Sequence, residues 1–147
     1  SCLVGWDDRE LANQCLVYSY ILNYEPYNFK GRMTDIPLTA QYGMKIQKLR
    51  RRLWEYLWKG TFLHTDGAKV RPVGESGEYI YSVFEAANGK RAIAVANQEA
   101  ERALTLQVAA DSGCEKFLLY TPEEDGAKVS GSIVEIPARC ACVLVEQ

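Results

Sequence analysis

The chain has 147 residues, of which 48% are hydrophobic and 24% charged, and its formal net charge is −2 at pH 7. These proportions are typical of folded globular proteins and argue against extensive disorder. The small negative charge gives no general attraction to nucleic acid or anionic membranes. No apolar run approaches the ~20 residues of a membrane-spanning helix. We therefore expect neither nucleic acid nor membrane as a partner.

The first residue is Ser1 rather than Met, which favours a fragment or a processed product. Residues 1–10 have neither the basic start nor the apolar region of a signal peptide, so we expect none there. The compartment is left open by these features. The five cysteines are odd in number and have no CxxC spacing, which argues against a disulfide framework or a zinc ribbon. We expect no metal and no cofactor.

A first helix is expected from about Asp7 to Asn23. Asp7 and Glu10 have the spacing of a capping box, and their charges suit the positive end of a helix dipole. Apolar residues then recur at steps of four, three and four, as on one face of a helix. This expected buried face consists of Leu11, Cys15, Tyr18 and Leu22.

A second helix is expected to begin near Asp35, with Pro37 in its first turn, and to end near Gly60. Its expected buried stripe consists of Tyr42, Ile46, Leu49, Leu53 and Tyr56. Trp54 and Trp58 are four residues apart and share a helix face. We expect them to pack against another part of the protein, and a sugar-stacking strip is the alternative. The interspersed lysines and arginines predict a solvated helix face.

Residues 61–77 contain several turn signals and predict a boundary. Beyond them the apolar period changes from 3.6 to 2, which predicts strands. Asn88-Gly89 predicts a hairpin with a type I′ turn between the first two. The six expected strands are about 79–86, 91–97, 104–108, 115–121, 129–136 and 140–146. The sequence thus predicts an α+β fold, with two N-terminal helices followed by an antiparallel β-sandwich of about six to eight strands.

Three strand sequences carry a resemblance to a known family. They are Ala-Ile-Ala-Val-Ala-Asn-Gln at 92–98, Ala-Leu-Thr-Leu-Gln-Val at 103–108 and Ile-Val-Glu-Ile-Pro-Ala-Arg-Cys-Ala-Cys-Val-Leu-Val at 133–145. This part resembles the C-terminal β-sandwich that follows the catalytic (β/α)8 barrel in many glycoside hydrolases. Residues 24–32 and 49–58 resemble the end of such a barrel. The resemblance covers nearly the whole chain.

The resemblance implies two regions: a helical segment at 1–64 from the end of a catalytic barrel, and a β-sandwich accessory domain at 65–147. A complete barrel needs about 250 residues, so the catalytic carboxylates would lie upstream. The implied role is the non-catalytic C-terminal portion of a glycosidase-like protein. Its implied partner is the upstream barrel domain of the same protein. We expect the isolated chain to be inactive and to contain no catalytic residue.

The segment most suited to contact a carbohydrate is the aromatic loop between the two expected helices. Its rings could lie against a sugar face while its polar side chains bind hydroxyl groups, as small-ligand sites generally combine apolar and polar groups. The alternative is that the rings pack beneath the loop and that its charges pair with one another. The candidate ligand-binding residues are Tyr24, Glu25, Tyr27, Asn28, Lys30 and Arg32.

Two other functions stay open. A stand-alone carbohydrate-binding module would use the β-sandwich, with Tyr79, Tyr81 or Tyr120 in contact with the glycan. Tyr79 and Tyr81 are two residues apart in an expected strand and therefore share a face. A protein-interaction domain would instead use apolar helix faces that the truncated barrel leaves open.

Overall fold

The structure is a computed structural model that describes residues 13–14, 16–18, 38–124 and 126–147. Most of the expected first helix lies outside these ranges. Residues 13–14 and 16–17 are helical, and two further helices and nine strands follow along the described chain. These elements are α2 (Leu38–Arg52), α3 (Trp54–Leu57), β1 (Thr61–Phe62), β2 (Ala68–Pro72), β3 (Tyr79–Glu85), β4 (Arg91–Asn97), β5 (Leu104–Ala110), β6 (Phe117–Tyr120), β7 (Lys128–Ser130), β8 (Ile133–Ile136) and β9 (Ala141–Glu146).

The described strands form two sheets. One has six strands in the order β1-β3-β4-β9-β6-β7, and the other has three in the order β2-β5-β8. Every pairing is antiparallel. The fold is therefore α+β, as the sequence predicts, although the nine strands exceed the expected six to eight. None of the helices in the described ranges has the length and apolar character needed to cross a membrane.

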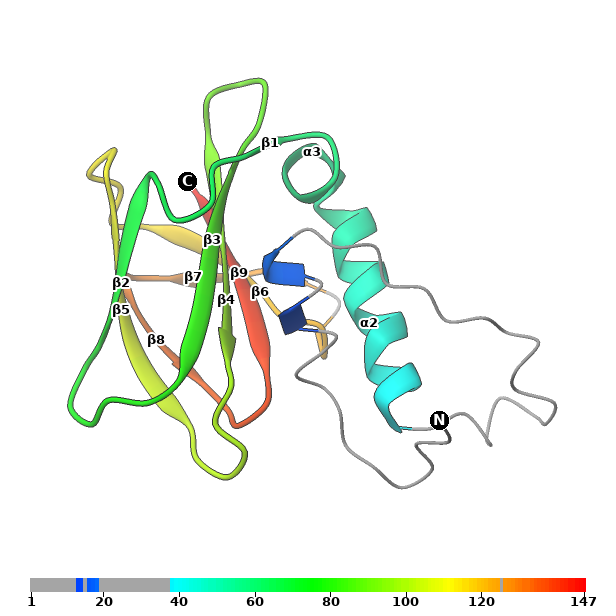
Figure 1. Ribbon diagram of the computed structural model, residues 1–147. Coiled ribbons are helices and arrows are strands. Elements are labelled where there is room, and N and C mark those ends of the chain that lie inside the picture. The colour runs from blue at the N-terminus through cyan, green and yellow to red at the C-terminus, as the bar shows by residue number, and fades with distance from the viewer. Residues whose placement is uncertain (1–12, 15, 19–37, 125) are drawn as a thin grey trace, which may run out of the picture.

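The six-stranded sheet lies in the middle of three layers (Figure 1). On one side it packs against α2 and α3, and on the other it faces the three-stranded sheet. Two separate groups of buried apolar side chains fill the two spaces. The helices and the β-module therefore share the central sheet.

Strands β4 and β9 are buried on both faces, which explains why their sequences are almost continuously apolar. Successive side chains of a strand point to opposite faces, so each strand serves both cores. On β4 the helix side carries alanines and the other side carries branched residues. The small side chains face the helical layer and the Leu16–Val17 segment, while the larger ones fill the space between the sheets. The alanines are Ala92, Ala94 and Ala96, and the branched residues are Ile93 and Val95.

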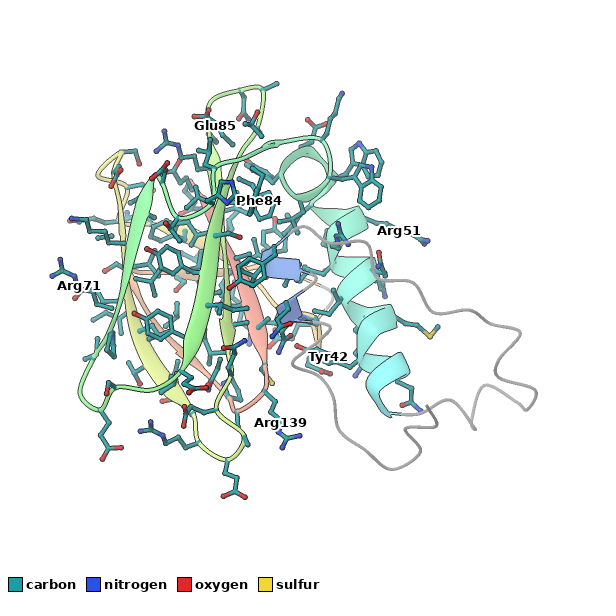
Figure 2. The ribbon with its side chains drawn as sticks, in the orientation of Figure 1. Tyr42, Arg51, Arg71, Phe84, Glu85 and Arg139 are labelled. Atoms are coloured by element: carbon teal, nitrogen blue, oxygen red, sulfur yellow. The ribbon has the colours of Figure 1, made fainter. Side chains whose placement is uncertain are left out.

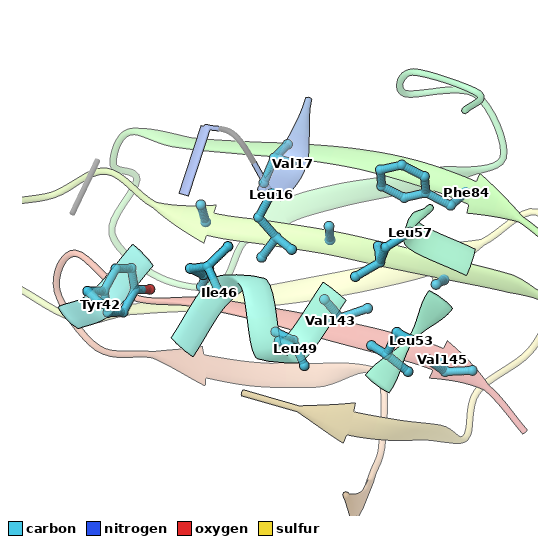
Figure 3. Close-up of a cluster of buried hydrophobic side chains, with 14 residues drawn as sticks. Leu16, Val17, Tyr42, Ile46, Leu49, Leu53, Leu57, Phe84, Val143 and Val145 are labelled. Atoms are coloured by element: carbon cyan, nitrogen blue, oxygen red, sulfur yellow. The ribbon is translucent and has the colours of Figure 1, made fainter. Parts of the chain in front are cut away.

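The helical layer is held by the apolar stripe of α2 (Figure 3). Tyr42, Ile46, Leu49 and Leu53, spaced by four, three and four residues, are all buried against the central sheet, as predicted. Tyr56, the fifth predicted member of the stripe, is only partly buried. The basic residues 50–52 end the helix, where positive charge complements the helix dipole. From the N-terminal segment, Leu16 and Val17 enter the same core, whereas Tyr18, expected to be buried, is exposed. The Ser82 hydroxyl donates a hydrogen bond to the Val17 carbonyl and ties this segment to β3.

The expected second helix is divided at Leu53, whose backbone leaves helical geometry at φ −102° and ψ 37°. The Leu53 and Leu57 amides still donate to carbonyls four residues earlier, so α3 continues the chain of α2 after a bend. After α3 the chain passes close to the end of β3 at Gly60. A Cβ there would lie 2.4 Å from the Tyr56 carbonyl oxygen and 2.9 Å from that of Glu85. Only glycine fits this passage without a shift of the backbone.

The strand boundaries differ from the predicted ones in two places. Residues 61–77, expected to be a boundary, contain β1 and β2, and β2 is an edge strand that tolerates Pro72 at its end. The expected strand at 129–136 is two strands, β7 and β8, which belong to different sheets. The hairpin is confirmed, since β3 pairs with β4 and Glu85 lies opposite Arg91. The predicted type I′ turn is wrong, because Gly89 has a positive φ and Asn88 does not, and the Gly89 amide donates to the Ala86 carbonyl within a turn closed by Ala86 and Lys90.

Candidate functional site

The six candidate ligand-binding residues of the aromatic loop lie outside the described residues. They are Tyr24, Glu25, Tyr27, Asn28, Lys30 and Arg32. Their role in carbohydrate binding therefore stays a prediction. The described residues offer two other surfaces that are suited to contact a partner or a ligand.

The first surface is the Trp pair, Trp54 and Trp58. The rings do not pack against the β-module, one of the two expected partners, because they are 45% and 48% exposed. Packing against an upstream barrel, the other expected partner, stays a prediction. The two rings stack on each other with centroids 5.3 Å apart and planes inclined by 17°. Stacking covers one face of each ring and leaves a large apolar surface in contact with water. The spacing predicted a shared helix face correctly, but it could not indicate which way that face points.

Arginine side chains adjoin the Trp pair. The Arg50 guanidinium carbon lies 5.0 Å from the centre of the Trp58 ring, within the range of a cation–π interaction. Arg50 is itself only 3% exposed. Arg51 is exposed and points away from the sheets (Figure 2). The surface around the Trp pair therefore combines aromatic rings with positive charge.

Tyr79 and Tyr81 do not form an open aromatic platform. Both rings are partly buried against the core between the two sheets. The Tyr79 hydroxyl donates to the Val70 carbonyl at 2.7 Å, and the Tyr81 hydroxyl contacts the Ala68 carbonyl at 3.4 Å. Burial is the main reason that the pKa of Tyr81 is raised. These side chains join β3 to β2 across the two sheets, and Tyr120 is partly buried on the helical side.

The second surface is a cavity of about 310 Å³, hereafter the end cavity. It opens where β6 and β8 end and β9 begins, beside Tyr42 of α2. Apolar side chains from both sheets form much of its wall, including Leu119, Ile136 and Cys142. The Oγ1 atom of Thr121, which also lines it, is buried and has no hydrogen-bond partner in the described part of the chain.

Charged residues surround the end cavity and link the layers. Glu123 and Glu124 line it in the turn after β6. Lys45 of α2 pairs with Glu123 at 2.6 Å, and Lys128 of β7 pairs with Glu124 at 3.0 Å. A third lining carboxylate, Glu135, has no ion pair among the described residues. The lining thus contains three carboxylates and one ammonium group.

Two cysteines of the C-terminal strand region line the end cavity. Cys142 is 3% exposed, and its burial raises the pKa of the thiol to about 12. Cys140 is half-buried. Among the described residues, no group of three or more His, Cys, Asp or Glu side chains could hold a metal ion. Two cysteines in a terminal apolar strand predict small buried side chains; this prediction is confirmed for Cys142, whereas Cys140 is only partly buried.

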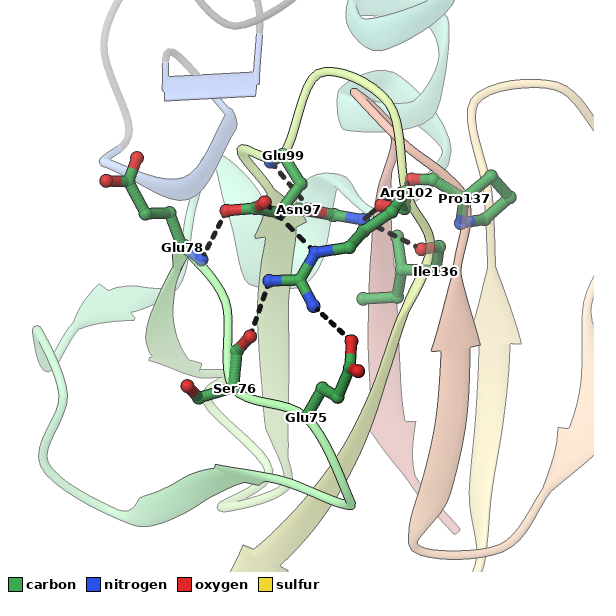
Figure 4. Close-up of polar contacts among 8 residues, drawn as sticks. All are labelled: Glu75, Ser76, Glu78, Asn97, Glu99, Arg102, Ile136 and Pro137. Atoms are coloured by element: carbon green, nitrogen blue, oxygen red, sulfur yellow. Dashed lines mark hydrogen bonds and ion pairs between the residues drawn. The ribbon is translucent and has the colours of Figure 1, made fainter.

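A polar network fixes the loops next to the end cavity (Figure 4). Asn97 ends β4 and is fully buried. Its amide nitrogen donates to the carbonyls of Arg102 and Ile136, each at 3.0 Å, and of Pro137 at 3.2 Å. Its amide oxygen accepts from the Glu99 backbone amide at 2.8 Å. Asn97 therefore positions the turn after β8, which lines the cavity.

A more open hollow of about 520 Å³ lies at the opposite ends of β4 and β9. Glu146 lines it and is buried. One carboxylate oxygen accepts from the Arg91 backbone amide at 2.9 Å, and the other accepts from the Ser112 hydroxyl. Because both oxygens have a partner, the geometry assigns Glu146 to holding the chain end in place.

Comparison of the chain with protein-family models, curated proteins and solved structures finds no match.

Proposed function

We propose that this chain is the non-catalytic C-terminal portion of a glycosidase-like protein. In this proposal α2 and α3 belong to the closing helices of a carbohydrate-active barrel, and residues 65–147 form its β-sandwich accessory domain. The chain would support the barrel and would have no hydrolytic activity alone. Its partner would be the upstream barrel of the same protein, with carbohydrate as the ligand of the whole.

The observation that carries the proposal is the exposure of the Trp pair. The opposite side of the helical layer is already buried on the central sheet. One face of the helical layer is apolar and packs on a sheet, and a second face carries two stacked indoles. Such a layer is suited to lie between two domains. An upstream barrel packed on Trp54 and Trp58 would remove the rings from water.

The β-sandwich part of the proposal is supported by the arrangement of the two sheets. Apolar residues alternate with exposed ones along β5 and β8, and their buried side chains meet those of the central sheet. This is the side-chain pattern of two sheets packed face to face. Such a module needs no catalytic group of its own.

The test is to express the chain with the sequence that precedes Ser1 in its gene and to compare it with residues 1–147. In the 147-residue chain, which has three tryptophans, a Trp6→Phe background leaves only Trp54 and Trp58. In the longer protein the same two rings are followed as the signal that a Trp54→Phe, Trp58→Phe variant loses. We expect acrylamide to quench their fluorescence several-fold less in the longer protein, because the barrel covers them. We also expect the longer protein, and not the isolated chain, to release 4-nitrophenol from aryl glycosides.

Equal quenching in both proteins would contradict the proposed contact. Turnover by the isolated chain that is abolished by Glu25→Gln would contradict the non-catalytic role. The Trp pair is also compatible with a protein-interaction domain that has a separate partner. In that case the upstream sequence would leave quenching unchanged, while size-exclusion chromatography of the isolated chain would show self-association that Trp54→Ser and Trp58→Ser reduce.

A carbohydrate-binding module is less well supported, because the hydroxyls of Tyr79 and Tyr81 contact β2. Affinity electrophoresis in polysaccharide gels separates this alternative from the first. An accessory domain without a glycan site should migrate as it does in a plain gel.

A further inference from the structure

We propose that the end cavity is a binding site for a small apolar organic cation, such as a protonated arylalkylamine. The proposal concerns a different surface from the Trp pair and does not depend on the upstream barrel. It rests on the size of the cavity, its apolar wall, its charge and one buried hydroxyl group.

The size and the wall of the end cavity suit a compact apolar group. Its volume of about 310 Å³ is at the lower end of the range for small-molecule sites, roughly 300–1,000 Å³. Leu119, Ile136 and Cys142 extend the core between the sheets to the cavity surface. An apolar ring placed there would cover Leu119, which is partly exposed, and would lie against the edge of this core.

The charge of the end cavity selects the polar end of the ligand. Of its three carboxylates, Glu123 and Glu124 already pair with lysines, whereas Glu135 is exposed and has no ion pair in the described ranges. An ammonium group near Glu135 would complete the pairing. An anion would be repelled by the excess of negative charge. A neutral group would leave the Glu135 carboxylate without an ion pair.

The Thr121 hydroxyl supplies a second polar contact. Its Oγ1 atom is buried beside the end cavity and has no hydrogen-bond partner among the described residues. A buried hydroxyl without a partner lowers stability, so a ligand that donates a hydrogen bond to it gains affinity. A protonated primary amine has three N–H groups and can contact the hydroxyl and a carboxylate together.

The first experiment compares three probes of the same shape: benzylamine, benzyl alcohol and benzoate. Titration of the full chain, followed by isothermal calorimetry or amide chemical shifts, gives a Kd for each. We expect benzylamine to bind roughly fivefold to tenfold more tightly than benzyl alcohol, the range of a partly exposed charged contact. Benzoate should bind most weakly. Equal affinities, or no binding of any probe, would overturn the proposal.

Two variants locate the contacts. Glu135→Gln removes the charge from an exposed position and should abolish the preference for benzylamine over benzyl alcohol. Thr121→Val should weaken the binding of both benzylamine and benzyl alcohol, because it removes the hydroxyl group that each can contact. Glu115→Gln is the matched control, because Glu115 is exposed and does not line the end cavity. If Glu115→Gln reduces the preference as much as Glu135→Gln does, the effect is one of general charge and the proposal fails.

Cys140 provides an independent reporter in the wall of the end cavity. In a Cys2→Ser, Cys15→Ser, Cys114→Ser background, iodoacetamide should react with half-buried Cys140 and leave Cys142 unmodified. Cys142 is protected because its thiol is buried and its pKa is raised to about 12. Saturating benzylamine should slow alkylation of Cys140 several-fold. Binding that leaves the Cys140 rate unchanged would place the amine elsewhere and overturn the proposal.

Discussion

Asn97 illustrates at the residue scale how one polar side chain orders several loops. Its amide contacts the backbone after β4, before β5 and after β8. Nearby, Arg102 adds contacts to Glu75, Glu99 and the Ser76 carbonyl. A fully buried amide whose hydrogen bonds are all made is stabilising, because burial without these partners would cost free energy.

We predict that Asn97→Ala lowers the free energy of unfolding by roughly 1–3 kcal/mol, because it removes a buried hydrogen bond to the Ile136 carbonyl and part-buried ones to the Arg102 and Pro137 carbonyls. Urea denaturation followed by circular dichroism measures the change. Gln98→Ala is the control, since the neighbouring side chain is half-buried and outside the Asn97 network; it should cost less than about 0.5 kcal/mol. Similar losses in both variants would contradict the role given to Asn97.

At the same scale, the sequence indicated which side chains share a face but not what lies opposite. The spacing of Tyr42, Ile46 and Leu49 identified the buried face of α2. The same reasoning placed Trp54 and Trp58 together, yet their surroundings depend on elements distant in the sequence. Nothing in the local pattern around Asn97 distinguishes a buried amide from one in an exposed loop.

At the element scale, Gly60 sets how closely the helical layer follows the central sheet. The chain leaves α3 and enters β1 within four residues, from Leu57 to Thr61. At Gly60 it passes two carbonyl oxygens that would contact any Cβ atom. The close passage brings β1 into register with the end of β3, where Thr61 lies opposite Glu85.

We predict that Gly60→Ala destabilises the protein by roughly 1–3 kcal/mol, the usual range for an added methyl group that forces the backbone to move. Chemical denaturation measures the free energy of unfolding. Gly131→Ala is the matched control, because an added Cβ there would contact nothing within 4 Å. A change of less than about 0.5 kcal/mol at both positions would show that the backbone near Gly60 adjusts freely.

The strands were predicted where alternation was long and uninterrupted. β3, β4 and β9 lie close to their expected bounds because at least six consecutive residues carry the pattern. β2 was missed because Pro72 was read as a break, although an edge strand can end in proline. The break between β7 and β8 was missed because the chain passes there from one sheet to the other, and the alternation of residues along the sequence does not mark such a change of sheet.

At the scale of the whole molecule, the central sheet joins the two outer layers into one unit. Its β4 and β9 strands contribute side chains to both cores. The Lys45–Glu123 ion pair and a hydrogen bond from Arg52 to the Glu124 carbonyl add contacts between α2 and the turn after β6. These exposed contacts are worth little singly, so apolar packing supplies most of the coupling.

We predict that Ala94→Leu, which adds bulk between α2 and β4, lowers stability by roughly 1–3 kcal/mol and leaves a single unfolding transition. Tryptophan fluorescence reports on the helical layer, and far-ultraviolet circular dichroism reports on the whole fold. The two midpoints should coincide before and after the change. Ala109→Leu, on an exposed side of β5, is the control. Separate midpoints would mean that the helical layer unfolds by itself.

The end cavity could not be predicted from any single segment of the sequence, because its wall exists only in the complete fold. Tyr42, Leu119, Ile136 and Cys140 come from four parts of the chain and meet only after both sheets have formed. The sequence did suggest that Cys142 is small and buried. It gave no sign that Cys140 lies in the wall of a cavity.

The double coverage of β4 also restricts how its sequence can change over evolutionary time. At Ala92, Ala94 and Ala96 the helices leave room for little more than a methyl group, whereas at Ile93 and Val95 the second sheet requires bulk. A substitution that suits one neighbour cannot be relieved by rotating the strand, because a shift by one residue exchanges the two sides. Descendants of this protein should therefore vary in the outer strands and loops long before they vary in β4.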